Sequence, residues 1–131
     1  MYGMKGLRMP LRYQRVGGSQ SHLPWTKKYK LTHPLVYESK AGLIITVPAG
    51  FITNFATWIR PRGKYDVAAA IHDYLYAIKA GRLYADRIFK ECMERGGCSR
   101  ARVNMMYWGV RIGGWFGYYV APAIAKLKRK Y

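Results

Sequence analysis

Acidic residues are scarce in this sequence. Its 131 residues include six Asp and Glu against 23 Lys and Arg, which gives a formal net charge of +17 at pH 7. A charge of this size repels itself unless an acidic partner neutralises part of it. The composition therefore predicts contact with a polyanion, namely nucleic acid, an anionic membrane surface or an acidic protein, and solvated basic tails without such a partner are the alternative.

Cysteine is almost as scarce. The chain has only Cys92 and Cys98, with no second pair and no Cys-x-x-Cys spacing. A disulfide framework, a zinc ribbon and a dithiol redox motif are therefore not supported. Two buried, reduced thiols are expected instead, as suits a reducing cytoplasm.

Uninterrupted apolar runs are also missing. Basic residues break up residues 1–18, so no secretory signal is expected and the chain is expected to be made and used without classical export. The most apolar stretch, residues 105–125, contains Arg111, several glycines and Pro122, which favours a core helix and an aromatic terminal segment over a transmembrane helix. Its clustered aromatic residues predict a protein–protein interface: Trp115, Phe116, Tyr118 and Tyr119.

The basic residues concentrate in three places. Residues 1–28 are basic, rich in Gly, Pro and Ser and without periodicity, which predicts an extended arm that orders only against a partner. Residues 117–131 form an aromatic and basic C-terminal segment. The residues predicted to bind a polyanion or a partner are Arg60, Arg62, Lys64, Lys126, Lys128, Arg129 and Lys130.

Residues 29–116 are predicted to form one α+β domain, a small antiparallel β-sheet followed by three helices, flanked by the basic N- and C-terminal arms. β-Branched and aromatic residues predict strands at 29–32, 35–38 and 42–47, with a hairpin turn at 39–42 and a loop at 49–55 that pairs again briefly. Apolar residues three and four positions apart then predict three helices. The first is about fifteen residues long and ends at Gly81, the second runs from about Tyr84 to Arg95, and Ser99 caps the third.

The candidate chemistry lies on the first two helices. Asp66, Asp73 and Asp86 surround His72, the only histidine on a predicted helix. Adjacent helical residues point about 100° apart, so His72 and Asp73 cannot bond each other, whereas Tyr76 shares the side of His72. Asp86, on the helix that returns antiparallel, is expected to reach His72.

Two interpretations of this group remain open. In a hydrolytic site, His72 would deprotonate water, Asp86 would fix its tautomer, Tyr76 would hold Asp86, and Asp73 would bind a cation. In a structural cluster, His72 would bond Asp86 or the loop around Asn54, and Asp86 would also satisfy backbone amides. Spacing alone favours the structural cluster.

A first resemblance concerns this helical region. The residues that carry it are Tyr65–Tyr76 and Ala85–Phe89. They resemble the His-Asp-x-x-Tyr and Ala-Asp-x-x-Phe pattern of phospholipase A2-like domains, including those of parvovirus capsids. The resemblance implies that His72 is the base, Asp73 binds calcium and Asp86 orients His72, with Tyr76 in support. The Gly-rich calcium loop of those enzymes, with Tyr-x-Gly-x-Gly, has no counterpart in this chain.

A second resemblance covers about residues 29 to 116. The stretches Val47–Thr57, Ala69–Tyr76 and Ala85–Phe89 are similar to an uncharacterised family of short proteins encoded mainly by tailed bacteriophages and prophages. Members of that family usually have Asp at the position of Asn54 and Ser at that of Thr57. The change to Asn keeps a carbonyl oxygen but loses the charge, which weakens the predicted calcium site at Asp73 and Asn54.

Together these observations predict a bacteriophage virion-associated protein, made in the host cytoplasm and located in the virion. The preferred hypothesis is a minor structural component of the tail or neck, built on a domain with a degenerate hydrolase-like site and contacting other virion proteins. One alternative is a calcium-dependent, phospholipase A2-like hydrolase that acts on the host envelope during entry. The other is a non-specific nucleic-acid-binding protein, although no sequence-reading motif is present.

Overall fold

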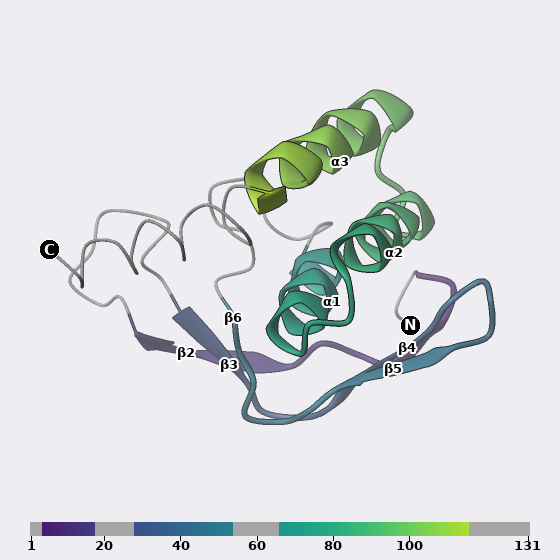
Figure 1. The fold of residues 1–131 in the computed structure, drawn as a ribbon. Helices are drawn as coiled ribbons and strands as arrows, with labels where there is room; N and C mark the ends of the chain where they lie inside the picture. The colour runs from purple at the N-terminus through teal and green to yellow at the C-terminus, as the bar shows by residue number, and fades with distance from the viewer. Residues whose placement is uncertain (1–3, 18–27, 54–65, 116–131) are drawn as a thin grey trace, which may run out of the picture.

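The computed structural model describes residues 4–17, 28–53 and 66–115, and its fold is α+β, as the sequence predicts (Figure 1). The strands form two three-stranded antiparallel sheets rather than one, and three helices follow them. The elements are β1 (Leu7–Met9), β2 (Tyr13–Gly17), β3 (Lys28–Leu31), β4 (Leu35–Glu38), β5 (Ile44–Val47), β6 (Ile52–Thr53), α1 (Asp66–Ala77), α2 (Arg82–Arg95) and α3 (Arg100–Trp115).

The strand orders are β1-β4-β5 in one sheet and β2-β3-β6 in the other. The predicted hairpin joins β4 to β5, and its turn closes where the Gly42 amide donates to the Ser39 carbonyl at 2.9 Å. Gly42 has a φ of +85°, a conformation that favours glycine. The chain then pairs again briefly, because β6 lies antiparallel to β3 with Thr53 opposite Tyr29.

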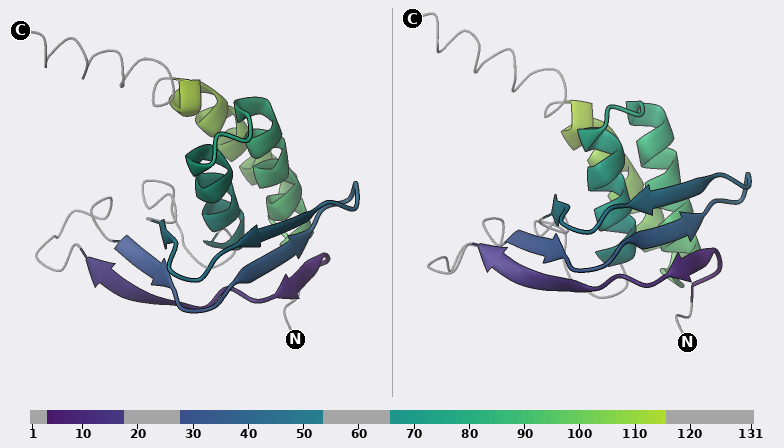
Figure 2. Two further views of the ribbon diagram at one scale, coloured as in Figure 1. Left: turned by 60° about the horizontal axis from the view of Figure 1, so that its bottom comes forward. Right: turned by 90° about the horizontal axis from the view of Figure 1, so that it is seen from below.

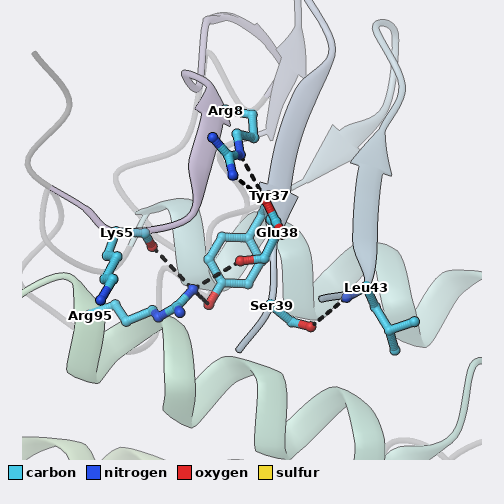
Figure 3. Close-up of polar contacts among 7 residues, drawn as sticks. All are labelled: Lys5, Arg8, Tyr37, Glu38, Ser39, Leu43 and Arg95. Atoms are coloured by element: carbon cyan, nitrogen blue, oxygen red, sulfur yellow. Dashed lines mark hydrogen bonds and ion pairs between the residues drawn. The ribbon is translucent and has the colours of Figure 1, made fainter. Parts of the chain in front are cut away.

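The N-terminal segment is part of the sheets, so the prediction of an extended arm is wrong for its two strands. β1 pairs with β4, and β2 pairs with β3, both antiparallel. The Gly6 carbonyl accepts from the Glu38 amide at 2.7 Å, and Arg95 of α2 donates to the carbonyls of Lys5 at 3.3 Å and Glu38 at 2.9 Å (Figure 3). Because β1 and β2 lie at sheet edges and are held mainly through backbone groups, their side chains carry no clear apolar pattern.

The helices cover one face of the sheets, and the core lies between them (Figure 2). Alternate strand residues face this core, so Leu35, Tyr37 and Val47 are completely buried. On the opposite face, Ile44 and Ile52 are exposed. The core therefore has one sheet layer and one helical layer, with α3 outermost (Figure 1).

The helix boundaries differ modestly from those predicted. α1 has 12 residues rather than about fifteen, and α2 begins two residues before Tyr84. Ser99 caps α3 as predicted, because its hydroxyl accepts from the Arg102 amide at 3.3 Å. No helix within the described residues is long and apolar enough to cross a membrane.

Candidate functional site

Three side chains from two helices converge on one buried carboxylate of a third helix. His72 and Tyr76 come from α1, Asp86 from α2 and Arg111 from α3. His72 Nε2 lies 2.7 Å from Asp86 Oδ1, and the Tyr76 hydroxyl donates to the same oxygen at 2.9 Å. Arg111 Nη1 donates to the other oxygen, Oδ2, at 3.0 Å. We call these four residues the Asp86 cluster, and it contains all three residues predicted as the catalytic set.

Local helix geometry explains why the cluster forms. His72 and Tyr76 are four positions apart, so they stand one above the other on the same side of α1. Gly81, with a φ of +115°, lets the chain reverse between α1 and α2, which brings Asp86 opposite them. The His72 ring packs between Tyr76 and Phe89, whose ring centres lie 4.3 and 4.9 Å away. These contacts hold the imidazole in one orientation.

The cluster keeps Asp86 ionised. Its side chain is fully buried, and burial alone would raise the pKa of the carboxyl group. The hydrogen bonds from His72, Tyr76 and Arg111 outweigh this effect and hold the pKa of Asp86 below its usual value. Burial, followed by the hydrogen bond to Asp86, raises the pKa of Tyr76 to about 12, so Tyr76 stays a hydroxyl donor at neutral pH.

The geometry also assigns the histidine tautomer. A carboxylate only accepts hydrogen bonds, so His72 carries its proton on Nε2, the atom that faces Asp86. In a neutral ring, Nδ1 then has the lone pair that can accept a proton. The His72 side chain is 10% exposed. A histidine oriented in this way is chemically equipped to act as a general base.

Arg111 is the member of the cluster that the sequence analysis missed. It was treated only as an interruption of the apolar stretch. A single arginine within an apolar stretch that packs on the core usually needs a buried acidic partner, and this signal points to one of the few acids in the chain. The Arg111 carbonyl also accepts from Arg82 Nη2 at 2.6 Å, which ties α3 to the start of α2.

Asp73 lies apart from the Asp86 cluster, as its position next to His72 requires. It is half-buried and accepts a hydrogen bond from the Thr53 hydroxyl at the end of β6. Calcium prefers six to eight oxygen ligands, and within the described residues no group of three or more His, Cys, Asp or Glu side chains could hold a metal ion. Asp73 is the one described residue of the predicted calcium site, so calcium binding stays a prediction.

The other predicted site residues lie outside the described residues, as does the side chain of Trp115 at the end of α3. They are Asn54, Arg60, Arg62, Lys64, Phe116, Tyr118, Tyr119, Lys126, Lys128, Arg129 and Lys130.

The two cysteines are both thiols, but they differ in accessibility. Burial raises the pKa of Cys92 to about 12, whereas Cys98 is only half-buried. We expect a disulfide-exchange reagent at about pH 8 to modify Cys98 in the native protein and Cys92 only after unfolding, because the thiolate is the reactive form. Thiol titration with and without denaturant measures this. In a Cys98→Ser variant, native labelling should be absent, and rapid labelling there would contradict the buried position of Cys92.

Comparison with known proteins identifies one family. A family model described as "Protein of unknown function (DUF1353)" matches residues 29–110, which is more than half of the chain. No curated protein and no solved structure matches the chain.

Proposed function

Because the chain belongs to this protein family of unknown function, its role has to be inferred from its own residues, and we propose that it is a virion-associated bacteriophage protein with a hydrolytic site at the Asp86 cluster. The phage assignment is supported by the motifs at residues 47–57, 69–76 and 85–89. The net charge of +17 supports a place beside anionic material such as the host envelope or other virion components.

The hydrolytic proposal depends on one observation, the 2.7 Å contact between His72 Nε2 and Asp86 Oδ1. In the proposed reaction, Nδ1 of His72 removes a proton from water as the water oxygen attacks an ester or amide carbonyl. The anionic Asp86 stabilises the resulting imidazolium, and Tyr76 holds the carboxylate in place. The imidazolium then returns the proton to the leaving group as the scissile bond breaks.

A cation would assist this reaction by polarising the substrate carbonyl when bound. Asp73 and Asn54 are the residues proposed to hold it. Asp73 is suited in one respect, because its carboxylate is half-buried rather than fully buried and it lies on the helix that carries His72.

Substitution of His72 tests the proposal. We expect the wild-type protein to release fatty acid from phosphatidylglycerol vesicles in the presence of calcium, and His72→Ala to lower the rate by at least about 100-fold through loss of the base. His33→Ala is the matched control, because His33 is an exposed histidine between β3 and β4 that is not part of the Asp86 cluster, and it should keep the wild-type rate. Full activity in His72→Ala would exclude His72 as the base.

A second candidate is supported by Arg111. Its guanidinium already balances the charge of the fully buried Asp86. The contacts therefore also support a purely structural role, in which the cluster joins α1, α2 and α3. The protein would then be a structural component of the tail or neck. If the wild-type protein releases no fatty acid while His72→Ala lowers the free energy of unfolding, this second proposal replaces the first.

A further inference from the structure

The most exposed large apolar side chains of the described residues lie on one helix. Met105, Trp108 and Ile112 of α3 are 63%, 60% and 71% exposed. They are three and four positions apart, so they form a single stripe along the helix. We call this stripe the α3 outer face.

The α3 outer face is not needed to attach α3 to the protein. Val103, Met106 and Val110, on the other side of the helix, are 1%, 3% and 2% exposed and belong to the core. α3 is also the helix farthest from the sheets, and Figure 1 shows it on the outside of the described residues. The stripe is therefore displayed on the outer surface of the helix.

Charge indicates what this surface contacts. α3 contains no Asp or Glu, and Arg100 and Arg102 are exposed near its N-terminus. A second copy of a chain with net charge +17 would be repelled. An anionic surface would instead be attracted to the arginines while the apolar stripe provides the contact.

A second group of exposed apolar and basic side chains lies near the C-terminal half of α3. Arg82 donates to the Arg111 carbonyl, which places the turn between α1 and α2 beside the C-terminal half of α3. Ile78 and Leu83, on either side of this turn, are 54% and 44% exposed, and Lys79 between them is exposed as well. The turn between α1 and α2 therefore has exposed apolar and basic side chains side by side, as α3 does.

We propose that the α3 outer face docks the protein on an anionic lipid surface. Trp108 has an apolar ring and one polar N–H, which suits the boundary between headgroups and acyl chains. Met105 and Ile112 enter the apolar layer beside it, and Arg100 and Arg102, near the N-terminus of the same helix, contact the headgroup phosphates. A fluid membrane accommodates a convex helix without a preformed groove. This docking is independent of whether the Asp86 cluster is hydrolytic.

Vesicle binding by the full chain tests this proposal. We expect the wild-type protein to sediment with phosphatidylglycerol vesicles much more than with phosphatidylcholine vesicles. The Met105→Ser/Trp108→Ser/Ile112→Ser variant should bind phosphatidylglycerol at least about tenfold more weakly, because the inserted apolar groups are lost. The matched control is Leu43→Ser/Ile44→Ser/Ile52→Ser. It removes three apolar side chains, at the start of β5 and in β6, that are 54%, 58% and 52% exposed, and it should bind like the wild type.

Trp108→Phe provides a second measurement that does not depend on the triple variant folding. Brominated phosphatidylglycerol should quench the wild-type tryptophan fluorescence more than that of Trp108→Phe. Equal quenching, equal binding by the two triple variants, or no wild-type binding would each overturn the proposal. It would also be overturned if the wild type formed dimers without lipid and the α3 variant did not, since the α3 outer face would then be an interface between copies.

Discussion

Asp86→Asn is expected to lower the free energy of unfolding by about 3 kcal/mol, the lower end of the usual cost of breaking a buried ion pair. The amide is nearly the same size as the carboxylate but carries no charge. The Arg111 guanidinium, whose side chain is 26% exposed, and the buried His72 would then lose their anionic partner. Urea unfolding at neutral pH measures the loss. The dependence of the unfolding free energy on urea concentration should be compared between variants, because it must stay the same for the comparison to hold.

The same substitution should also remove a pH dependence. The pKa of Asp86 lies below its usual value in the folded protein, so the unfolded chain takes up the proton first as the pH falls. The stabilisation is therefore complete above the unfolded pKa of about 3.9 and is lost as the pH drops through the folded pKa. Unfolding measured across this acidic range should show a smaller loss in Asp86→Asn than in the wild type.

Asp73→Asn is the matched control for these measurements. Asp73 is half-buried and accepts a hydrogen bond from the neutral Thr53 hydroxyl rather than from a cation, so the expected cost is about 1 kcal/mol. Equal losses from the two substitutions would contradict the central position of Asp86 in the helix packing.

Gly6→Ala is expected to destabilise the protein by about 3 kcal/mol, since it combines a strained backbone with a steric clash. Gly6 has a φ of +88°, and an added Cβ would lie only 2.4 Å from both the Glu38 carbonyl oxygen and Arg95 Nη1. Arg95 could move, but it would then give up its bonds to the N-terminal segment. The Glu38 carbonyl belongs to the central strand β4 and cannot move without disturbing the sheet.

Gly50→Ala separates the two contributions. Gly50 has a similar φ of +91°, but an added Cβ there would meet no atom within 4 Å. Only the backbone strain remains, and the expected loss is about 1 kcal/mol. Thermal or urea unfolding of both variants measures the difference. A neutral Gly6→Ala would contradict the docking of residues 4–9 on β4.

The elements with regular apolar spacing were predictable from the amino-acid sequence. Three-to-four spacing predicted α1, α2 and α3, and β-branched and aromatic residues predicted β3, β4 and β5. The four-residue separation of His72 and Tyr76 placed them on one side of α1. Asp86 was then the acid that an antiparallel return could bring to them.

Contacts between residues far apart in the sequence were not predictable in this way and became clear from the folded arrangement. β1 pairs with β4 although Leu7 and Tyr37 are about 30 positions apart in the sequence. The pairing uses backbone groups that every residue has, so no residue type predicts it. Arg111 meets Asp86 from a third helix, and only the packing angle of α3 shows that the guanidinium turns inward.

The same physical reason applies to the α3 outer face. The spacing of apolar residues predicts that a helix has a buried face, and α3 is apolar on both sides. Val103, Met106 and Val110 have the spacing from which this helix was predicted and enter the core, whereas Met105, Trp108 and Ile112 have the same spacing and remain exposed. That choice depends on where α2 lies, because burial is a property of the neighbours that a side chain meets in the folded protein.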